Sequence, residues 1–202
     1  AAPAPAHTRP TSVPRLLGAQ LQPVYGLGRE RNLEERAVSR LSGYRGMGPV
    51  RVGNANFAMQ QHGVYGSVVL AATQMFFDQR LERQGDVCLF EDLCYVGRKA
   101  LEVFVSGRVD SGPWALRREE CVVGDETRMH TFGAIMCWAA CDRLAKIARQ
   151  LGLPESQREW RAHADFIRRQ VRERAWDAAA QTYTSSLRPA RRGARSGSEA
   201  SA

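Results

Sequence analysis

A short loop in the middle of the chain carries residues that can bind a sugar. Gly112 and Pro113 favour a turn, and Trp114 follows them directly. An indole on a turn either offers an apolar platform to a pyranose ring or is wedged into the core to anchor the loop. Arg117 either binds hydroxyl groups or pairs with Glu119. The loop is therefore a candidate binding element, with two interpretations open for each side chain.

A second polar stretch, GYRGMGPVRVGNANFAMQQHGVYGS, covers residues 43–67. Four glycines precede Asn54, and Gln61 and Tyr65 lie within the helix that is predicted there. A side-chain amide has both donor and acceptor groups, which suits the hydroxyl groups of a sugar. The alternative is a capped helix start with a polar outer face. The stretch is therefore either a sugar-binding element or a capped helix start with a polar outer face.

A third stretch marks the entrance of a long apolar helix. His130 and Thr131 precede the apolar pattern, and Thr131 is predicted to be the N-cap. Further along the same helix, Asp142 and Arg143 are interpreted as an ion pair or as charges on the helix face. These roles are structural, so this stretch predicts a frame for the two binding elements.

The elements that must position these residues are helical. Apolar residues recur at spacings of three and four over four segments, which are residues 55–84, 89–106, 131–150 and 155–175. The third segment has a broad apolar surface and the fourth a narrow stripe, which indicates a buried helix beside an outer one. The best strand signal is the short run at 49–53. The sequence therefore predicts an all-α fold with two layers of helices.

The two ends of the chain differ from its middle. Residues 1–20 are rich in Pro and Ala, and residues 187–202 are rich in Arg, Gly and Ser. Neither composition can bury a core, so both ends are expected to be disordered, with one partial domain at 21–186.

The charge and the cysteines restrict the class of protein. The net charge is +8, but much of it lies in the two ends, and basic residues elsewhere alternate with acidic ones, so a nucleic-acid partner is not expected. No apolar run reaches the roughly 18 residues that indicate a membrane span. The five cysteines include no Cys-x-x-Cys pair and are interpreted as buried thiols, which fits a reducing, cytoplasmic setting.

Three blocks together resemble a known family. GYRGMGPVRVGN (43–54), VYGSVVLAATQMFFDQRL (64–81) and MCWAACDRLAKIA (136–148), with TYTSS at 182–186, are similar to bacterial members of glycoside hydrolase family 15. These are glucoamylase-like and trehalase-like enzymes, and the resemblance covers about residues 21–186. It implies a partial (α/α)₆ toroid of the six-hairpin glycosidase type, with about four of its helices present. It implies no metal, nucleotide or redox cofactor.

The resemblance also implies a chemistry. Family members hydrolyse α-glucosidic bonds with inversion, using one carboxylic acid as proton donor and a second carboxylate that activates water, roughly 6.5–9.5 Å apart. The expected ligand is an α-glucoside or oligosaccharide. The residues that match substrate-binding positions are Asn54, Gln61, Tyr65, Trp114 and Arg117.

The sequence departs from the family at catalytic positions. Ala115 stands where the family has its glutamic acid proton donor, and Gly63 stands where relatives have an aspartate. The regions that hold the family's base and its early substrate-binding Arg-Asp pair are not matched. The resemblance therefore implies a hydrolase segment that is inactive alone. The alternatives are a non-catalytic carbohydrate-binding remnant and a helical interaction protein.

An incomplete ring of helices has a physical consequence. The apolar face of the third helix is expected to be partly exposed, and large exposed apolar patches drive association. We therefore predict that the chain associates with itself through exposed apolar helix faces.

Overall fold

The computed structural model describes residues 21–107, 122–123, 126–127 and 129–189. Within these ranges the chain forms four α-helices, which are α2 (Gly63–Phe77), α3 (Val87–Ser106), α5 (Thr131–Gln150) and α6 (Pro154–Ala175). The strands are short antiparallel pairs: β1 (Arg36–Val38) with β2 (Val50–Val52), β3 (Val122–Val123) with β4 (Glu126–Thr127), and β5 (Trp176–Asp177) with β6 (Thr182–Tyr183). The predicted all-α class is confirmed. None of the helices described is both long and apolar enough to cross a membrane.

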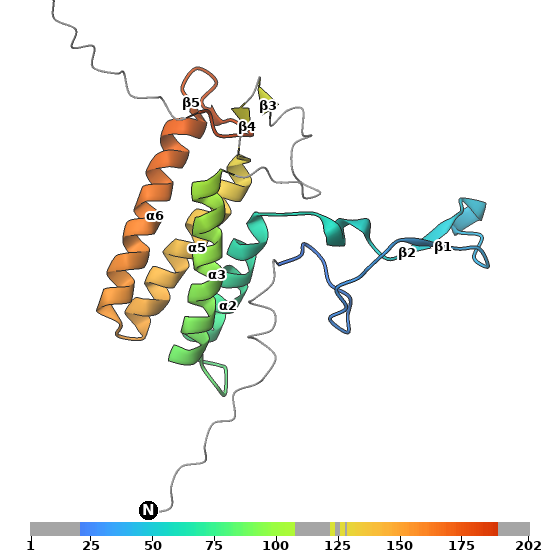
Figure 1. Ribbon diagram of the computed structural model, residues 1–202. Coiled ribbons are helices and arrows are strands. Elements are labelled where there is room, and N and C mark those ends of the chain that lie inside the picture. The colour runs from blue at the N-terminus through green and yellow to red at the C-terminus, as the bar shows by residue number, and fades with distance from the viewer. Residues whose placement is uncertain (1–20, 108–121, 124–125, 128, 190–202) are drawn as a thin grey trace, which may run out of the picture.

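The four helices form two antiparallel hairpins, α2–α3 and α5–α6 (Figure 1). Helix α5 packs against all three others, and α2 lies beside α5 and runs in the same direction. Helices α3 and α6 run in the opposite direction, as Figure 1 shows. This alternation of two parallel helices with two returning helices is the arrangement expected for part of an α/α toroid.

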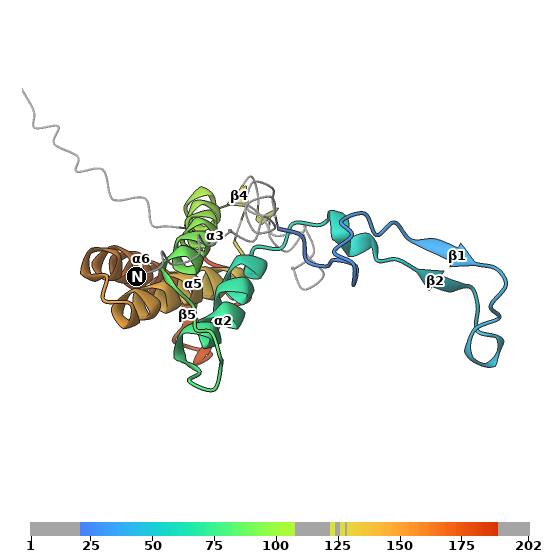
Figure 2. The ribbon, with the colours of Figure 1, turned by 90° about the horizontal axis from the view of Figure 1, so that it is seen from below.

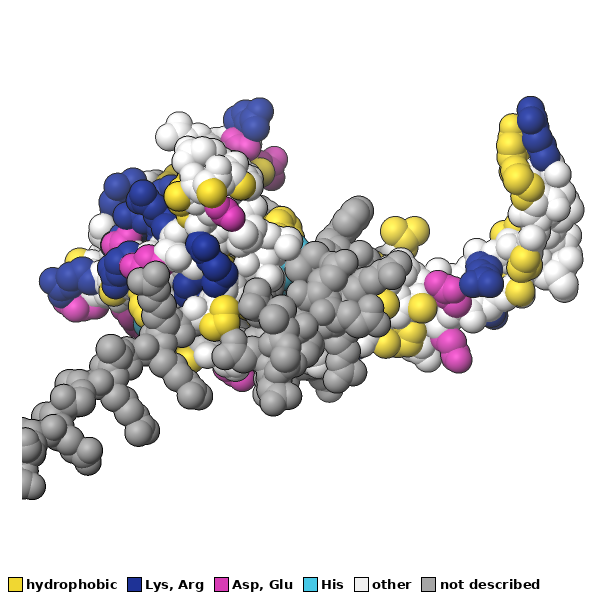
Figure 3. Space-filling model, turned by 90° about the horizontal axis from the view of Figure 1, so that it is seen from above, with side chains coloured by type: hydrophobic (Ala, Val, Ile, Leu, Met, Phe, Trp, Pro, Cys, Tyr) yellow, Lys and Arg dark blue, Asp and Glu magenta, His cyan; other side chains and the backbone are white. Residues whose placement is uncertain are grey.

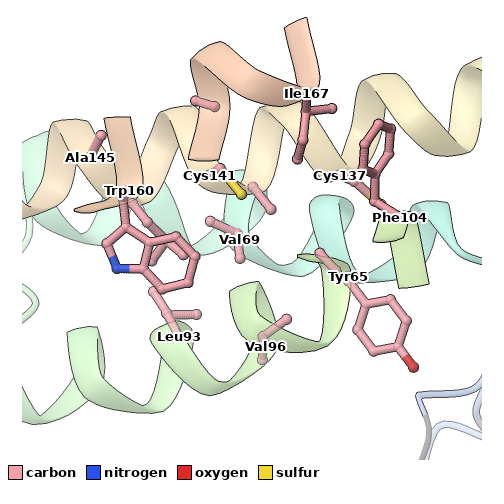
Figure 4. Close-up of a cluster of buried hydrophobic side chains, with 14 of the residues drawn as sticks. Tyr65, Val69, Leu93, Val96, Phe104, Cys137, Cys141, Ala145, Trp160 and Ile167 are labelled. Atoms are coloured by element: carbon pink, nitrogen blue, oxygen red, sulfur yellow. The ribbon is translucent and has the colours of Figure 1, made fainter. Parts of the chain in front are cut away.

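The hydrophobic core lies where α5 meets the other helices (Figure 4). Cys137, Cys141, Leu144 and Ile147 of α5 have no exposed surface, which accounts for the broad apolar surface predicted for this helix. Trp160 of α6 is 1% exposed and packs into the same cluster. The prediction of buried thiols is confirmed for Cys137 and Cys141, but it is wrong for Cys88, which lies exposed in the first turn of α3.

The first predicted helix is much shorter than expected. Residues Ala55–Ala58 form a 3₁₀ helix, and α2 begins only at Gly63 and ends at Phe77. The backbone of Met59 is extended and interrupts the helix, and Asp78 is extended at its other end. Apolar residues continue past both breaks, but Met59 and Leu81 there are exposed, so their spacing does not mark where the helix begins and ends.

The other three helices match their predictions closely. Helix α3 begins two residues before the prediction, because the Asp86 carboxylate accepts a hydrogen bond from the Leu89 N–H and caps the helix. Helix α5 has the predicted bounds, but its N-cap is His130, so the prediction of Thr131 as N-cap is wrong. The α5–α6 turn is tight because Gly152 adopts φ of +70° and Pro154 starts α6.

The chain between Leu21 and His62 forms an arm that extends away from the helices (Figures 1 and 2). Both ends of the arm lie at the helices, because Leu21 packs against the core and His62 is buried at the start of α2. Strands β1 and β2 pair in the arm, with Arg36 opposite Val52, which confirms the strand predicted at 49–53. Gly53 has φ of +93°, and a Cβ atom there would collide with the Glu34 carbonyl oxygen. Figure 3 shows hydrophobic side chains along the arm, and its exposed apolar residues include Leu41, Tyr44 and Met47.

Candidate functional site

The starts of α2 and α5 lie side by side at one end of the helices (Figure 1). Gly63 faces the Phe132 ring, and a Cβ atom on Gly63 would lie 2.9 Å from it. One turn further along, Gly66 packs directly on the backbone of Met136. The two glycines therefore allow α2 to approach the first turns of α5 closely.

The segment after β6 returns to the same end and fixes the start of α5. The Thr131 N–H donates to the Ser185 carbonyl at 2.8 Å, and the Leu187 N–H donates to the Met129 carbonyl at 2.9 Å. Leu187 is 1% exposed, so this segment is packed against the start of α5. In the sequence, Ser185 and Ser186 belong to the TYTSS motif, and periodicity gives no signal for a contact this distant in sequence.

The polar character of this end suits oxygen ligands. His62 and Thr131 are buried at the two helix starts, and the Thr131 hydroxyl has no hydrogen-bond partner among the residues described. Neither α2 nor α5 has a side-chain cap or an acidic residue in its first turn. The positive ends of two helix dipoles therefore point to the same region, which favours hydroxyl or anionic oxygen atoms.

The structure places two predicted binding residues at the start of α2. Gln61 is half-buried, and its carbonyl accepts a hydrogen bond from the Val64 N–H at 3.3 Å. Tyr65 lies one turn further on, but its ring packs in the core near Val96 and Phe104 of α3 (Figure 4). Its hydroxyl points out of this cluster. Burial raises the pKa of Tyr65, an effect that the nearby Lys99 partly offsets.

Of the remaining predicted binding residues, the structure describes Asn54. Asn54 lies in the arm, where its Oδ1 atom accepts a hydrogen bond from the Asn56 N–H at 3.1 Å. Trp114, Ala115 and Arg117 lie outside the described residues. Across the ranges that the structure describes, no three His, Cys, Asp or Glu side chains are grouped to hold a metal ion.

A pocket that the sequence did not predict lies between α5, α6 and the β5–β6 hairpin. Its volume is about 380 Å³. The side chains that line it are apolar, aromatic and basic, and they belong to Ile135, Trp138, Arg168, Val171, Arg172 and Tyr183. The Tyr183 ring makes an edge-to-face contact with Trp176, with ring centroids 5.1 Å apart. We name these six lining residues the groove. Two of its residues carry a sequence signal, because Trp138 and Val171 belong to the apolar patterns of the third and fourth predicted helices.

Comparison with known proteins relates the chain to sugar-cleaving enzymes. Residues 117–201 match the family described as mannosylglycerate hydrolase MGH1-like glycoside hydrolase domain. A trehalase of Mycobacterium tuberculosis is 32% identical over 160 residues, which is 78% of this chain and 22% of the relative. A trehalase of Mycolicibacterium smegmatis is 31% identical over 157 residues, with the same two coverages. A trehalase of Thermoplasma volcanium is 26% identical over 165 residues, covering 81% of this chain and 24% of the relative.

The chain spans between a fifth and a quarter of the length of these relatives. No solved structure matches it. The matched glycoside hydrolase domain includes α5, α6 and the β5–β6 hairpin, and the trehalase similarities extend over most of the chain. Together these similarities support a place for the chain among the glycosidases.

Proposed function

We propose that this chain is part of the catalytic domain of an inverting α-glucosidase of glycoside hydrolase family 15, acting in cytoplasmic carbohydrate metabolism. The observation that carries the proposal is the similarity to trehalases, which extends over 78% of the chain at 32% identity. It favours trehalose over a starch-derived oligosaccharide as the substrate. The adjacent starts of α2 and α5 support a sugar site at that end, because the positive ends of two helix dipoles point there and neither first turn carries an acidic residue.

In this proposal the five family-matched residues either contact the sugar or support the residues that do. Trp114 stacks on a pyranose ring, and Arg117 and Gln61 bind hydroxyl groups. Asn54 holds the turn that leads into the 3₁₀ helix, and the Tyr65 hydroxyl lies at the edge of the core.

Ala115 limits what the chain can do by itself. A methyl group has no proton to give, and a positioned general acid contributes about 10²–10⁴-fold to a rate. We therefore propose that the chain binds an α-glucoside but does not cleave trehalose. The second candidate function, a non-catalytic carbohydrate-binding remnant, is favoured by the same residue.

Two measurements test these proposals. Isothermal titration with trehalose, and with maltose for comparison, should show saturable binding that is lost in Gln61→Ala. Cellobiose, whose two glucose units are β-linked, is the control for a non-specific sugar effect. If neither α-glucoside binds, both the hydrolase and the carbohydrate-binding proposals are wrong, and a helical interaction protein is left.

The catalytic assignment is tested at position 115. α-Glucosyl fluoride needs little help from a general acid because fluoride is a good leaving group. Its hydrolysis therefore tests the groups that bind the sugar and activate water. In a chain extended through the family's helices that carry the catalytic base, Ala115→Glu should raise trehalose cleavage relative to the same chain with Ala115, whereas Ala115→Gln, of similar size, should not. Cleavage of trehalose by the extended chain with Ala115 as fast as by its Ala115→Glu variant would contradict the proposed role of this position.

A further inference from the structure

The groove is an open surface of mixed character. Ile135 and Val171 form its apolar part, and Trp138 and Tyr183 add aromatic surface. Tyr183 is 48% exposed although it lines a pocket, so a large aromatic face remains in water. A pocket of about 380 Å³ has room for an aromatic side chain from another molecule.

The basic residues of the groove favour an acidic partner. Arg168 and Arg172 lie one helical turn apart on α6, and both are exposed. Arg168 makes a loose ion pair with Asp165 at 3.7 Å, and Arg172 has no ion pair within the described part of the chain. A carboxylate that reached this edge would find guanidinium groups able to bind it in a bidentate manner.

Helix α3 presents a complementary surface on the opposite side from its core contacts. Its exposed residues include Val87, Glu91, Tyr95, Glu102 and Val105, which recur at helical spacing on one side. We name these five residues the α3 face. Tyr95 is 38% exposed and Val105 is 70% exposed. The α3 face is therefore apolar at three positions and acidic at two.

Glu91 and Tyr95 form the part of the α3 face that best fits the groove. They lie four residues apart, so an acidic group and an aromatic ring stand one above the other on the helix. Glu91 has no ion pair within the described residues, whereas Glu102 pairs with Lys99 at 2.8 Å. Arg98 lies on the same side of α3, but its guanidinium forms an ion pair with Glu159 at 3.2 Å and lies over the Trp160 ring.

We propose that the groove of one copy of this chain binds the α3 face of a second copy, with Tyr95 in the pocket and Glu91 at Arg168 and Arg172. The two surfaces cannot meet within one chain, because α3 turns its opposite side to the core. The interface is head-to-tail, so each copy has one groove and one α3 face to offer. Such an interface continues from copy to copy unless its rotation closes a ring.

Sedimentation velocity over a range of protein concentrations tests the proposal, with helical circular dichroism to verify that each variant is folded. The wild-type chain should associate as its concentration rises. Arg172→Glu and Glu91→Arg should each weaken association about tenfold or more, because like charges then face each other. Tyr95→Ala should weaken it by a similar factor through loss of the aromatic anchor.

Two further samples, measured in the same way, test whether association depends on contact between the groove and the α3 face. The double variant Arg172→Glu with Glu91→Arg should regain association, because the charge pair is restored with reversed sign. A mixture of the two single variants should also associate beyond dimers, because each groove then meets an α3 face of opposite charge on the other variant, although neither variant does so alone.

Matched controls carry the same charge changes elsewhere. Arg169→Glu on α6 and Glu82→Arg before α3 are exposed and lie outside both surfaces, so they should leave association unchanged. A wild-type chain that is monomeric at every concentration overturns the proposal. So does association that survives both single reversals, since it would then depend on other surfaces such as the arm.

Discussion

The Asp142 carboxylate of α5 accepts a hydrogen bond from the Arg161 guanidinium of α6 at 2.8 Å. Arg143 and Lys146 also lie within 2.9 Å of the same carboxylate, whose side chain is 8% exposed. The ion pair expected between Asp142 and Arg143 is thus part of a larger cluster that joins the two helices of one hairpin. One buried carboxylate pairs with three partly exposed cations, so removal of its charge would break every ion pair of the cluster.

Asp142→Asn should lower the free energy of unfolding by about 1–3 kcal/mol, less than for a fully buried pair because the cations can turn to water. Urea unfolding followed by circular dichroism measures this. Glu155→Gln is the control, because Glu155 pairs with Arg158 on an exposed surface, and such pairs contribute about 0–1 kcal/mol. Equal losses in the two variants would contradict the role given to Asp142.

The same carboxylate should make stability depend on pH in acid. Burial alone raises the pKa of Asp142, but hydrogen bonds from Arg161 and Lys146 outweigh it and hold the pKa below its ordinary value of 3.8. A depressed folded-state pKa contributes stability that is present above the unfolded-state pKa and is lost as the pH falls through the folded-state value. The difference in unfolding free energy between wild type and Asp142→Asn should therefore be constant near neutral pH and shrink in acid below about pH 4. A difference that does not change with pH would mean that the carboxylate charge is not the cause.

The sequence predicted well those elements whose ends carry a local signal. Helix α5 has the predicted bounds, and Gly152 and Pro154 set the turn into α6 in the way that their backbone preferences require. The first helix was predicted too long, because the apolar spacing from Phe57 onward does not register the extended backbone of Met59.

Contacts between segments that are far apart in sequence could not be predicted from local spacing and capping signals. The hydrogen bond between Thr131 and Ser185 joins the start of α5 to the segment that follows α6. These residues are far apart in sequence, and no spacing rule indicates the contact. Tyr65 was predicted to line a sugar site from its place in a motif. Its ring also contributes to the core between α2 and α3, a packing role that the motif does not indicate.

Gly66→Ala should destabilise the fold, although alanine is the better helix former. In an open helix interior this change adds about 0.5–1 kcal/mol of stability. At Gly66 the new methyl group would collide with the carbonyl of Met136, which belongs to the backbone and cannot rotate away. We expect a net loss of about 1–3 kcal/mol as α2 and α5 are forced apart.

Thermal unfolding of Gly66→Ala and of Ser67→Ala, at the exposed neighbouring position, measures this effect. The Ser67 change should stay within about 0.5 kcal/mol of wild type. A stabilised Gly66→Ala variant would show that the starts of α2 and α5 are further apart than described.

Thiol reactivity should follow burial along the chain. Among the cysteines that the structure describes, Cys88 is exposed and should be labelled first by a maleimide at neutral pH. Burial raises the pKa of Cys94 to about 11 and that of Cys141 to about 12, so both should react slowly, since the thiolate is the reactive form. Mass spectrometry of labelled peptides assigns each rate to its site, and labelling in urea provides the fully reactive reference. Because Cys141 lies at the centre of the core, its labelling at the rate of Cys88 in the folded chain would mean that α5 is not enclosed by the other three helices.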